Sequence, residues 1–192
     1  MSEILTAQQF AEHRTELPDG GRWAELVAGR VMSFQPPDPQ HGTTLLNLSK
    51  ALAKHLQAGR AVHTGYACFE LGLLVSRNPD TVRFPAVSYF ASGSRFAHTD
   101  EVLTAASPDL VIEVPAASDR RRDMSQRVRE YLALGASLVW VVDPLEQQVH
   151  VFPKLGSSQR VAAQQRLTGD DVLSGFELDV ADLFSEPAWW RG

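Results

Sequence analysis

Three residues of this sequence combine chemically useful side chains with positions that call for an explanation. Glu113 interrupts the apolar stretch Leu110–Val114, which has the pattern of a buried strand. A carboxylate there is costly unless it is paired, bound to a metal ion, or placed at the open end of a sheet. Glu25 lies inside another predicted strand, and His41 directly precedes a predicted helix. We take these three residues as candidates for a site.

An arginine-rich segment follows Glu113 and has two interpretations. The first is a solvated helix face, stabilised by ion pairs such as Asp123 with Arg127 at a spacing of four residues. The second is a surface whose guanidinium groups bind phosphate oxygens. The charges of the segment are Arg120, Arg121, Arg122, Arg127 and Arg129 against Asp119, Asp123 and Glu130, a local excess of two positive charges.

Each candidate also has an explanation without chemistry. Glu113 could be a buried glutamate that a neighbouring arginine or histidine satisfies, His41 a helix-start residue, and Glu25 a solvent-facing strand residue. Asp109 shares one strand face with Glu113, but the two lie roughly 13 Å apart at about 3.3 Å per residue. One divalent ion with ligands at about 2.1–2.6 Å cannot readily bridge that gap. Asp109 is therefore interpreted as a residue at the start of the strand.

Composition describes an ordinary folded domain. The 192 residues are 44% hydrophobic and 21% charged, which predicts one domain over 1–192 with a sizeable core. A formal net charge of −5 argues against a surface covered in positive charge that binds nucleic acid non-specifically. The single cysteine, Cys68, excludes an intrachain disulfide and fits a reducing compartment. No apolar run suits a signal peptide or a membrane helix, so we expect a cytoplasmic protein and no membrane partner.

Hydrophobic spacing predicts a mixed α/β (α+β) fold with helices flanking a mixed sheet. The stretch 108–143 reads as strand, helix and strand, the order of a parallel pair with a helical crossover. Gly29 suits the left-handed turn of an N-terminal hairpin. The other expected elements are helices over 7–13 and 43–57, strands within 61–76, one strand over 82–90, strands over 149–152 and 160–167, and a short final element at 183–184.

Five ordered segments together resemble the bacterial Uma family of putative restriction endonucleases. They are WAELVAGRVMSFQPPDPQHGTTLLNLSKAL, TVRFPAVSYF, SPDLVIEVPAAS, the helix and strand that follow it to Asp143, and SGFELDVADLF. The resemblance covers roughly residues 20–184. It implies the PD-(D/E)XK nuclease fold, a restriction-endonuclease-like mixed sheet, and metal-dependent hydrolysis of DNA.

The resemblance also assigns site residues and exposes two departures. Glu25 and His41 match the family's first-strand glutamate and helix-opening histidine, and Glu113 matches its second metal carboxylate. The first metal carboxylate falls at Ala86, where alanine replaces aspartate. The family's lysine, four residues before a tyrosine, falls at Arg127.

These departures point to weakened or lost catalysis. Mg²⁺, or Mn²⁺, is held by about two carboxylates, and one of them is missing. An arginine stays protonated, so Arg127 cannot act as a base, although it could still stabilise a phosphate. Asp80 or Glu70 could supply a replacement ligand. The alternative is an inactive nuclease-fold module that binds nucleic acid or a protein partner, and the pair Trp189 and Trp190 suggests a homodimer interface.

Overall fold

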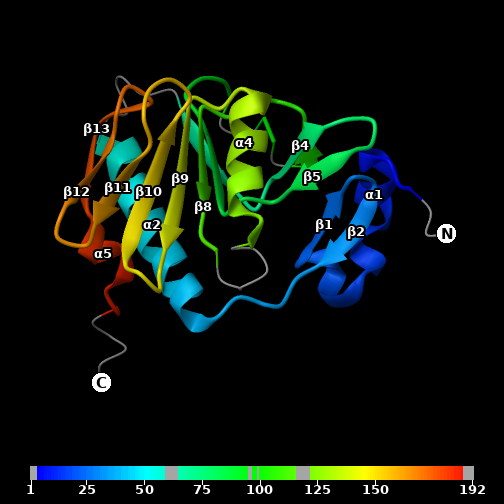
Figure 1. Ribbon diagram of the computed structural model, residues 1–192, viewed down its shortest axis with the longest axis horizontal. Coiled ribbons are helices and arrows are strands. Elements are labelled where there is room, and N and C mark those ends of the chain that lie inside the picture. The colour runs from blue at the N-terminus through cyan, green and yellow to red at the C-terminus, as the bar shows by residue number, and fades with distance from the viewer. Residues whose placement is uncertain (1–3, 59–64, 95–96, 99, 116–121, 188–192) are drawn as a thin grey trace.

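The computed structural model describes residues 4–58, 65–94, 97–98, 100–115 and 122–187, and its strands form two mixed sheets and a separate hairpin (Figure 1). The small sheet has the order β2 (Arg30–Ser33), β1 (Ala24–Val27), β5 (Thr81–Arg83), β4 (Gly72–Ser76) and β7 (Leu103–Thr104). The large sheet has the order β11 (Gln159–Ala162), β10 (Gln148–Pro153), β9 (Leu138–Asp143), β8 (Leu110–Glu113), β6 (Val87–Phe90) and β3 (Tyr66–Phe69). The hairpin pairs β12 (Arg166–Gly169) with β13 (Leu173–Asp179).

The N-terminal region forms as its local sequence signals predict. Thr6 caps α1 (Ala7–His13) through a reciprocal capping box with Gln9. Two short 3-10 turns follow, η1 (Arg14–Glu16) and η2 (Pro18–Gly21). Ala28 and Gly29 then join β1 to β2 with φ angles of 49° and 75°, the left-handed geometry of a two-residue hairpin turn.

The long helix α2 (Pro39–Ala58) begins four residues earlier than its apolar spacing predicts. The backbone N–H of His41 donates to Asp38 Oδ1 at 2.9 Å, so Asp38 acts as the helix cap. Proline is well tolerated at the first helical position because its missing N–H has no partner there in any case. The prolines therefore do not exclude a helix at Pro39, and His41 lies inside the first turn rather than before it.

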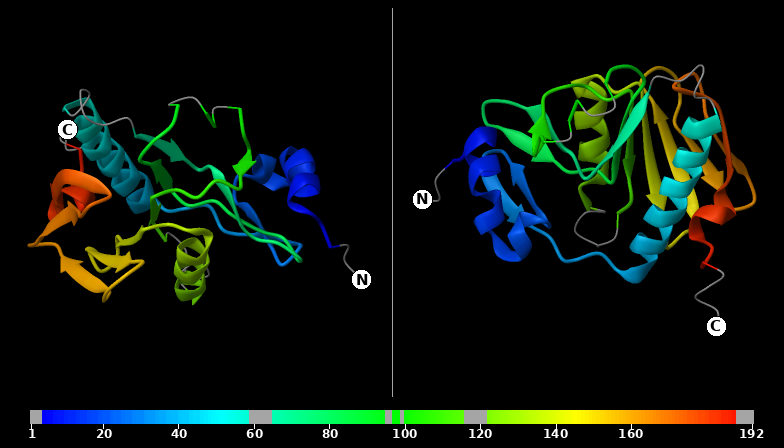
Figure 2. Two further views of the ribbon diagram at one scale, coloured as in Figure 1. Left: turned by 90° about the horizontal axis from the view of Figure 1, so that it is seen from above. Right: turned by 180° about the vertical axis from the view of Figure 1, so that it is seen from behind.

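The predicted strand–helix–strand unit is confirmed. β8 and β9 pair in parallel with Leu110 opposite Leu138 and Glu113 opposite Val141, and α4 (Met124–Leu134) is the helix between them. Figure 1 shows α4 in front of the large sheet, and the view from behind in Figure 2 shows α2 (cyan) on the opposite side. The unit thus places α4 on the same side of β8 as Glu113.

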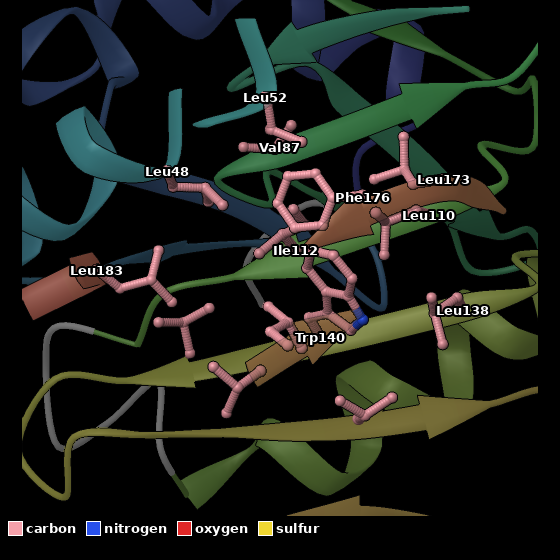
Figure 3. Packing of buried hydrophobic residues seen from close by; sticks show 14 of the residues in the cluster. Leu48, Leu52, Val87, Leu110, Ile112, Leu138, Trp140, Leu173, Phe176 and Leu183 are labelled. Atoms are coloured by element: carbon pink, nitrogen blue, oxygen red, sulfur yellow. The ribbon is translucent and has the colours of Figure 1, made fainter. Parts of the chain in front are cut away.

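Apolar side chains fill both faces of the large sheet. One cluster packs Leu48 and Leu52 of α2 against Ile112 of β8, Trp140 of β9 and Phe176 of β13 (Figure 3). A second cluster on the other face joins α4 to β8, β9 and β4, with these buried members: Leu73, Val111, Val128, Tyr131, Ala136, Val139 and Val141. Because strand side chains alternate, Glu113 falls on the α4 face with Val111.

Two element predictions need correction. The stretch 82–90 is divided at Pro85, because β5 joins the small sheet and β6 the large one. The stretch 160–167 is shared between β11 and β12. The predicted short final element at 183–184 is the end of a helix, α5 (Val180–Phe184). Within the described residues, no helix is long and apolar enough to cross a membrane. Trp189 and Trp190, the predicted interface pair, lie outside the described residues.

Candidate active site

Three charged side chains meet where the two sheets adjoin. Glu25 comes from β1 of the small sheet, Glu113 from the end of β8 in the large sheet, and Arg127 from the first turns of α4. All three have zero exposed surface. Ionised groups this deeply buried require direct partners, and each supplies them for the others.

Arg127 binds both carboxylates at once. Its Nη1 donates to Glu25 Oε1 at 2.9 Å and to Glu113 Oε1 at 3.1 Å, while its Nη2 donates to Glu25 Oε2. The centroid of the Phe34 ring, just after β2, lies 5.6 Å from the guanidinium carbon. The planar fork of arginine suits this bidentate contact with Glu25, which a lysine ammonium could not reproduce.

A second buried guanidinium extends the network. Arg83 Nη1 donates to Glu25 Oε2 at 3.1 Å, and its Nε and Nη2 reach both oxygens of Glu130 at 2.8 and 3.2 Å. The backbone N–H of Phe84 adds a bond to Glu25 Oε1 at 3.3 Å. Glu25 thus receives at least four hydrogen bonds from the described residues, and two guanidinium groups face the carboxylates of Glu25, Glu113 and Glu130.

Tyr131, one turn after Arg127 on α4, completes the contacts of Glu113. Its hydroxyl donates to Glu113 Oε1 at 2.6 Å, so this oxygen receives both Tyr131 and Arg127. The other oxygen, Glu113 Oε2, is buried and accepts no hydrogen bond from the described residues. One carboxylate oxygen of Glu113 therefore accepts two hydrogen bonds, and the other accepts none from the described residues.

The pKa values of the network follow its charges. Burial alone would lower the pKa of the Arg127 guanidinium, but the charges of Glu113 and Glu25 outweigh burial and raise it. Burial and the charge of Glu113 raise the pKa of Tyr131 well above its ordinary value. Arg127 is accordingly a fixed cation and Tyr131 a fixed hydrogen-bond donor at neutral pH, and neither can serve as a base.

The remaining predicted residues are placed as follows. His41 Nδ1 donates to the carbonyl of Val114 at 2.9 Å, so His41 adjoins the strand end that carries Glu113. The pairing of β6 with β8 begins at Val87 opposite Ile112, so Ala86 directly precedes the paired residues. The methyl group of Ala86 belongs to the apolar core cluster that contains Leu48. The position that the family gives to a carboxylate is therefore apolar and buried here.

The arginine-rich segment divides in two. Arg122 is exposed, whereas Arg120 and Arg121 lie outside the described residues. The expected surface pair of Asp123 with Arg127 is wrong, because Arg127 turns inward and is fully buried with Glu25 and Glu113.

The other acids considered from the sequence are engaged away from Glu113. Asp109 accepts the backbone N–H of Ala91 at 2.7 Å, consistent with a residue at the start of its strand. Asp80 accepts the N–H of Ala7 at the start of α1 at 2.8 Å. Glu70 lies 3.8 Å from Arg22 on the surface. None of these contacts brings a replacement carboxylate to the position of Ala86.

The sequence interpretation missed Arg83 and Glu130 and treated Tyr131 only as part of the scaffold. A signal for Arg83 was present, because it lies between the apolar residues Val82 and Phe84 in a stretch predicted to be a strand. A charge in such a strand implies an opposite charge nearby, as Glu113 did. Glu130 binds Arg83, which lies 47 positions away on another element, so no local spacing indicates this contact.

Comparison with known proteins decides the family. The family model described as Uma2, putative restriction endonuclease, matches residues 8–181. The chain belongs to the Uma2 family. No curated protein matches it significantly. A crystal structure of a putative nuclease belonging to DUF820, from Anabaena variabilis ATCC 29413, superposes with a TM-score of 0.72 at 20% identity, covering 94% of this chain and 97% of that one. That likeness shows the same fold, that of a nuclease-fold protein.

Restriction-endonuclease-like sites generally use a divalent metal ion held by carboxylates, but the side chains of this Uma2 chain do not fit one. Among the described residues, no group of three or more His, Cys, Asp or Glu side chains is arranged to hold a metal ion. Both oxygens of Glu25 and one of Glu113 already bind a guanidinium. Arg127 Nη1 lies between the two carboxylates, where its positive charge opposes a second cation.

Proposed function

We propose that this Uma2-family chain is a nuclease-fold binding module whose partner is DNA, and that metal-dependent hydrolysis at the Glu113 site is lost. The observation that carries the proposal is the bridge of Arg127 between Glu25 and Glu113. A guanidinium neutralises these carboxylates as a metal ion would, yet it has no coordination position in which a water molecule could be activated. It therefore cannot generate the hydroxide that attacks a phosphodiester.

Burial makes this arrangement hard to reverse. Freeing Glu25 and Glu113 for a metal ion would require Arg127 to leave a site where it has no exposed surface. Breaking a buried ion pair by removing one partner costs roughly 3–5 kcal/mol. A second acidic ligand for the ion would offset this cost, but the buried side chain at the family's ligand position is that of Ala86.

The chemistry test restores both substituted positions. Wild type, Ala86→Asp/Arg127→Lys, and the same double variant with Glu113→Gln are incubated with supercoiled plasmid and Mg²⁺ or Mn²⁺. We expect no nicking above background for wild type, nicking by the double variant, and its loss with Glu113→Gln. Mg²⁺ should also raise the melting temperature of the double variant but not that of wild type. Nicking by wild type that is absent from a Glu113→Gln single variant, assayed beside the others, would refute the loss of hydrolysis.

The binding test addresses DNA separately. Fluorescence anisotropy of a labelled duplex, repeated over a range of salt concentrations, measures affinity and its electrostatic part. We expect binding without added metal that weakens as salt rises, confined to one face because the net charge is −5. If the duplex does not bind even at low salt, the partner of this module is a protein rather than DNA.

A second candidate function retains hydrolysis with a rearranged site, and one observation favours it. Glu113 Oε2 accepts no hydrogen bond from the described residues, so a single carboxylate oxygen remains open. One oxygen beside a fixed guanidinium holds a divalent ion poorly, because Mg²⁺ prefers oxygen ligands in an octahedral shell. The expected homodimer stays a prediction, which sedimentation of the purified chain would test.

A further inference from the structure

A pocket lies between α4 and β10, on the face of the large sheet that α4 covers. Its volume is about 250 Å³, and its walls come from the segment after β8, the end of β9, the first turns of α4, and β10. Figure 1 shows α4 in front of the sheet with β9 and β10 beside it. Val128 follows Arg127 on α4, and Val141 pairs opposite Glu113, so the pocket adjoins the buried network. The network residues themselves do not line it.

The pocket is small, and one of its walls is aromatic. Sites for drug-sized ligands have volumes of roughly 300–1,000 Å³, so this pocket suits a single ring system or one side chain. His150 and Phe152 are two residues apart on β10 and therefore share a face. Both are partly exposed, and their ring planes differ by only 20° with centroids 6.4 Å apart. Met124 and Val128 of α4 also line the pocket, so a flat ring would meet apolar side chains from both the strand and the helix.

Three polar side chains complement this apolar lining. The carboxylate of Asp143 is fixed by two backbone N–H groups of the turn after β9, which donate to its Oδ1 at 3.0 and 3.3 Å. Gln148 Nε2 lies 3.1 Å from His150 Nε2, and an amide nitrogen can only donate, so the histidine proton is on Nδ1. Ser125 adds a hydroxyl that donates or accepts. The lining thus offers a charged acceptor beside two neutral hydrogen-bonding groups.

These groups favour a neutral ring over an anion. Among the described residues, no lysine or arginine lines the pocket, so the charge of Asp143 opposes a phosphate or a carboxylate inside it. A nucleobase has apolar faces that stack on aromatic rings, and its edge carries amino donors next to acceptor atoms. The pocket therefore suits a neutral ring that bears an amino group.

Two arginines lie outside the pocket on its two walls. Arg160 of β11 pairs opposite His150 and so shares its face of the sheet. Arg129 follows Ser125 by four residues on α4, which places it one turn further along the same side of the helix. Both are exposed, and neither has an ion-pair partner among the described residues. Guanidinium groups bind phosphate oxygens, and they oppose a cationic side chain as the occupant.

Exposed acids lie near the same end of the sheet. They are Asp123, just before α4, and Glu146, just after β9, and neither lines the pocket. The charges around the pocket are therefore mixed, and net charge does not identify the occupant. The arrangement does, because the lining acid can accept an amino group inside while the arginines can bind phosphates outside.

We propose that this pocket binds one nucleobase turned out of a DNA duplex, which rests on DNA being the partner of this module. The base lies against His150 and Phe152, and its exocyclic amino group donates to Asp143. The phosphates on either side of the base lie near Arg129 and Arg160. Cytosine, adenine and guanine carry such an amino group, whereas thymine does not. The pocket therefore reads one chemical feature of a base, beside the site where hydrolysis is lost.

The test compares three labelled duplexes by fluorescence anisotropy at low salt. One is fully paired, one has a cytosine opposite an abasic site, and one has a thymine opposite an abasic site. Because an unpaired base costs less to turn out than a paired one, we expect the unpaired-cytosine duplex to bind at least about fivefold more tightly than the paired duplex. The thymine duplex should show little of this gain. The methyl resonance of Met124, which lines the pocket, should shift when the cytosine duplex binds.

Variants separate the contacts with the base from those with the backbone. Phe152→Leu removes a ring but keeps an apolar side chain, so it should abolish the preference for unpaired cytosine. Leu155→Ala, at an 88% exposed residue outside the pocket, should retain that preference. Arg160→Ala should weaken binding of all three duplexes by a similar factor, because phosphate contacts carry no base information. Asp143→Asn keeps an acceptor for the turn and should narrow the gap between cytosine and thymine, which provides a second variant if Phe152→Leu lowers the melting temperature.

The contrary results distinguish the base pocket from the DNA partner. Equal affinity for the three duplexes would overturn the base pocket and leave DNA as the partner, whereas no binding of any duplex would overturn both. An unchanged preference in Phe152→Leu, or an unshifted Met124 methyl resonance, would place the unpaired base elsewhere. An arginine-rich peptide that shifts the Met124 resonance and binds more tightly than the cytosine duplex would assign the pocket to a cationic side chain of a protein partner.

Discussion

Arg127 and Arg166 make nearly the same contacts in opposite surroundings. Arg127 Nη1 binds two glutamates at 2.9 and 3.1 Å with no exposed surface on any partner. Arg166 binds Glu177 and Asp179 at 2.9 and 3.0 Å, and all three side chains are more than half exposed. Geometry alone does not distinguish these clusters. Solvent does, because water screens the surface charges and cannot reach the buried ones.

The difference explains why the buried cluster defines the candidate site and the surface cluster does not. At the surface, either partner can be lost and water replaces it. In the interior, each charge depends on the others, so Glu25, Glu113, Arg83 and Arg127 hold β1, β8, β5 and α4 in one arrangement.

The largest expected effect comes from removing the buried guanidinium. Arg127→Ala leaves the carboxylates of Glu25 and Glu113 without their shared cation, and Arg83 contacts only the first of them. We expect the free energy of unfolding at pH 7 to fall by roughly 3–5 kcal/mol. Urea denaturation followed by tryptophan fluorescence measures it. A loss below about 1 kcal/mol would mean that water enters the site and screens the ion pairs of Arg127 as it screens those of Arg166.

The sequence predicted the framework of this site better than its contacts. Apolar runs and a helical spacing locate Glu113 and the helix of Arg127, because those patterns depend on neighbouring residues. The bond between Glu25 and Arg127 joins residues 102 positions apart. Nothing local indicates that Arg127 points inward, since a surface pair with Asp123 satisfies the same helical spacing. The family register identified both residues but not the bridge between them.

The predictions for the start of α2 and for the stretch 82–90 were wrong for different reasons. Prolines near 36–39 argue against regular structure, yet Asp38 caps a helix that begins at Pro39. The apolar stretch 82–90 looks like one strand, and only the tertiary arrangement shows that it passes from one sheet to the other. That passage places Arg83 in the small sheet, where it joins the buried network, and Ala86 after Pro85, in the apolar core cluster of the large sheet.

An intermediate effect is expected at Tyr131, through pH. Burial and the charge of Glu113 raise its pKa in the folded state, whereas tyrosine in the unfolded chain ionises near about pH 10. Its contribution to stability is therefore complete below about pH 10 and is lost as pH rises further, because only the unfolded chain releases the proton readily. We expect wild type to lose more stability than Tyr131→Phe between about pH 8 and pH 11, by up to about 1.4 kcal/mol per pH unit above 10.

Urea midpoints of both proteins at the two pH values provide the measurement. Tyr66 and Tyr89, whose pKa values burial also raises, are present in both proteins, so their contributions cancel in the comparison. Tyr131→Phe also loses its bond to Glu113 at every pH, which lowers the baseline by roughly 1–3 kcal/mol but not its slope. Parallel pH profiles would show that the Tyr131 proton is not held by the network.

The smallest effect is expected at Arg166, and it completes the contrast. Arg166→Ala removes two ion pairs, yet its partners are exposed and water replaces the guanidinium. We expect no measurable shift in the urea midpoint. Raising the ionic strength to about 1 M, where the screening length is about 3 Å, should leave the Arg127→Ala defect nearly unchanged, because buried pairs are screened much less. A salt-sensitive Arg127 defect, or a large Arg166 defect, would mean that burial does not separate these two clusters.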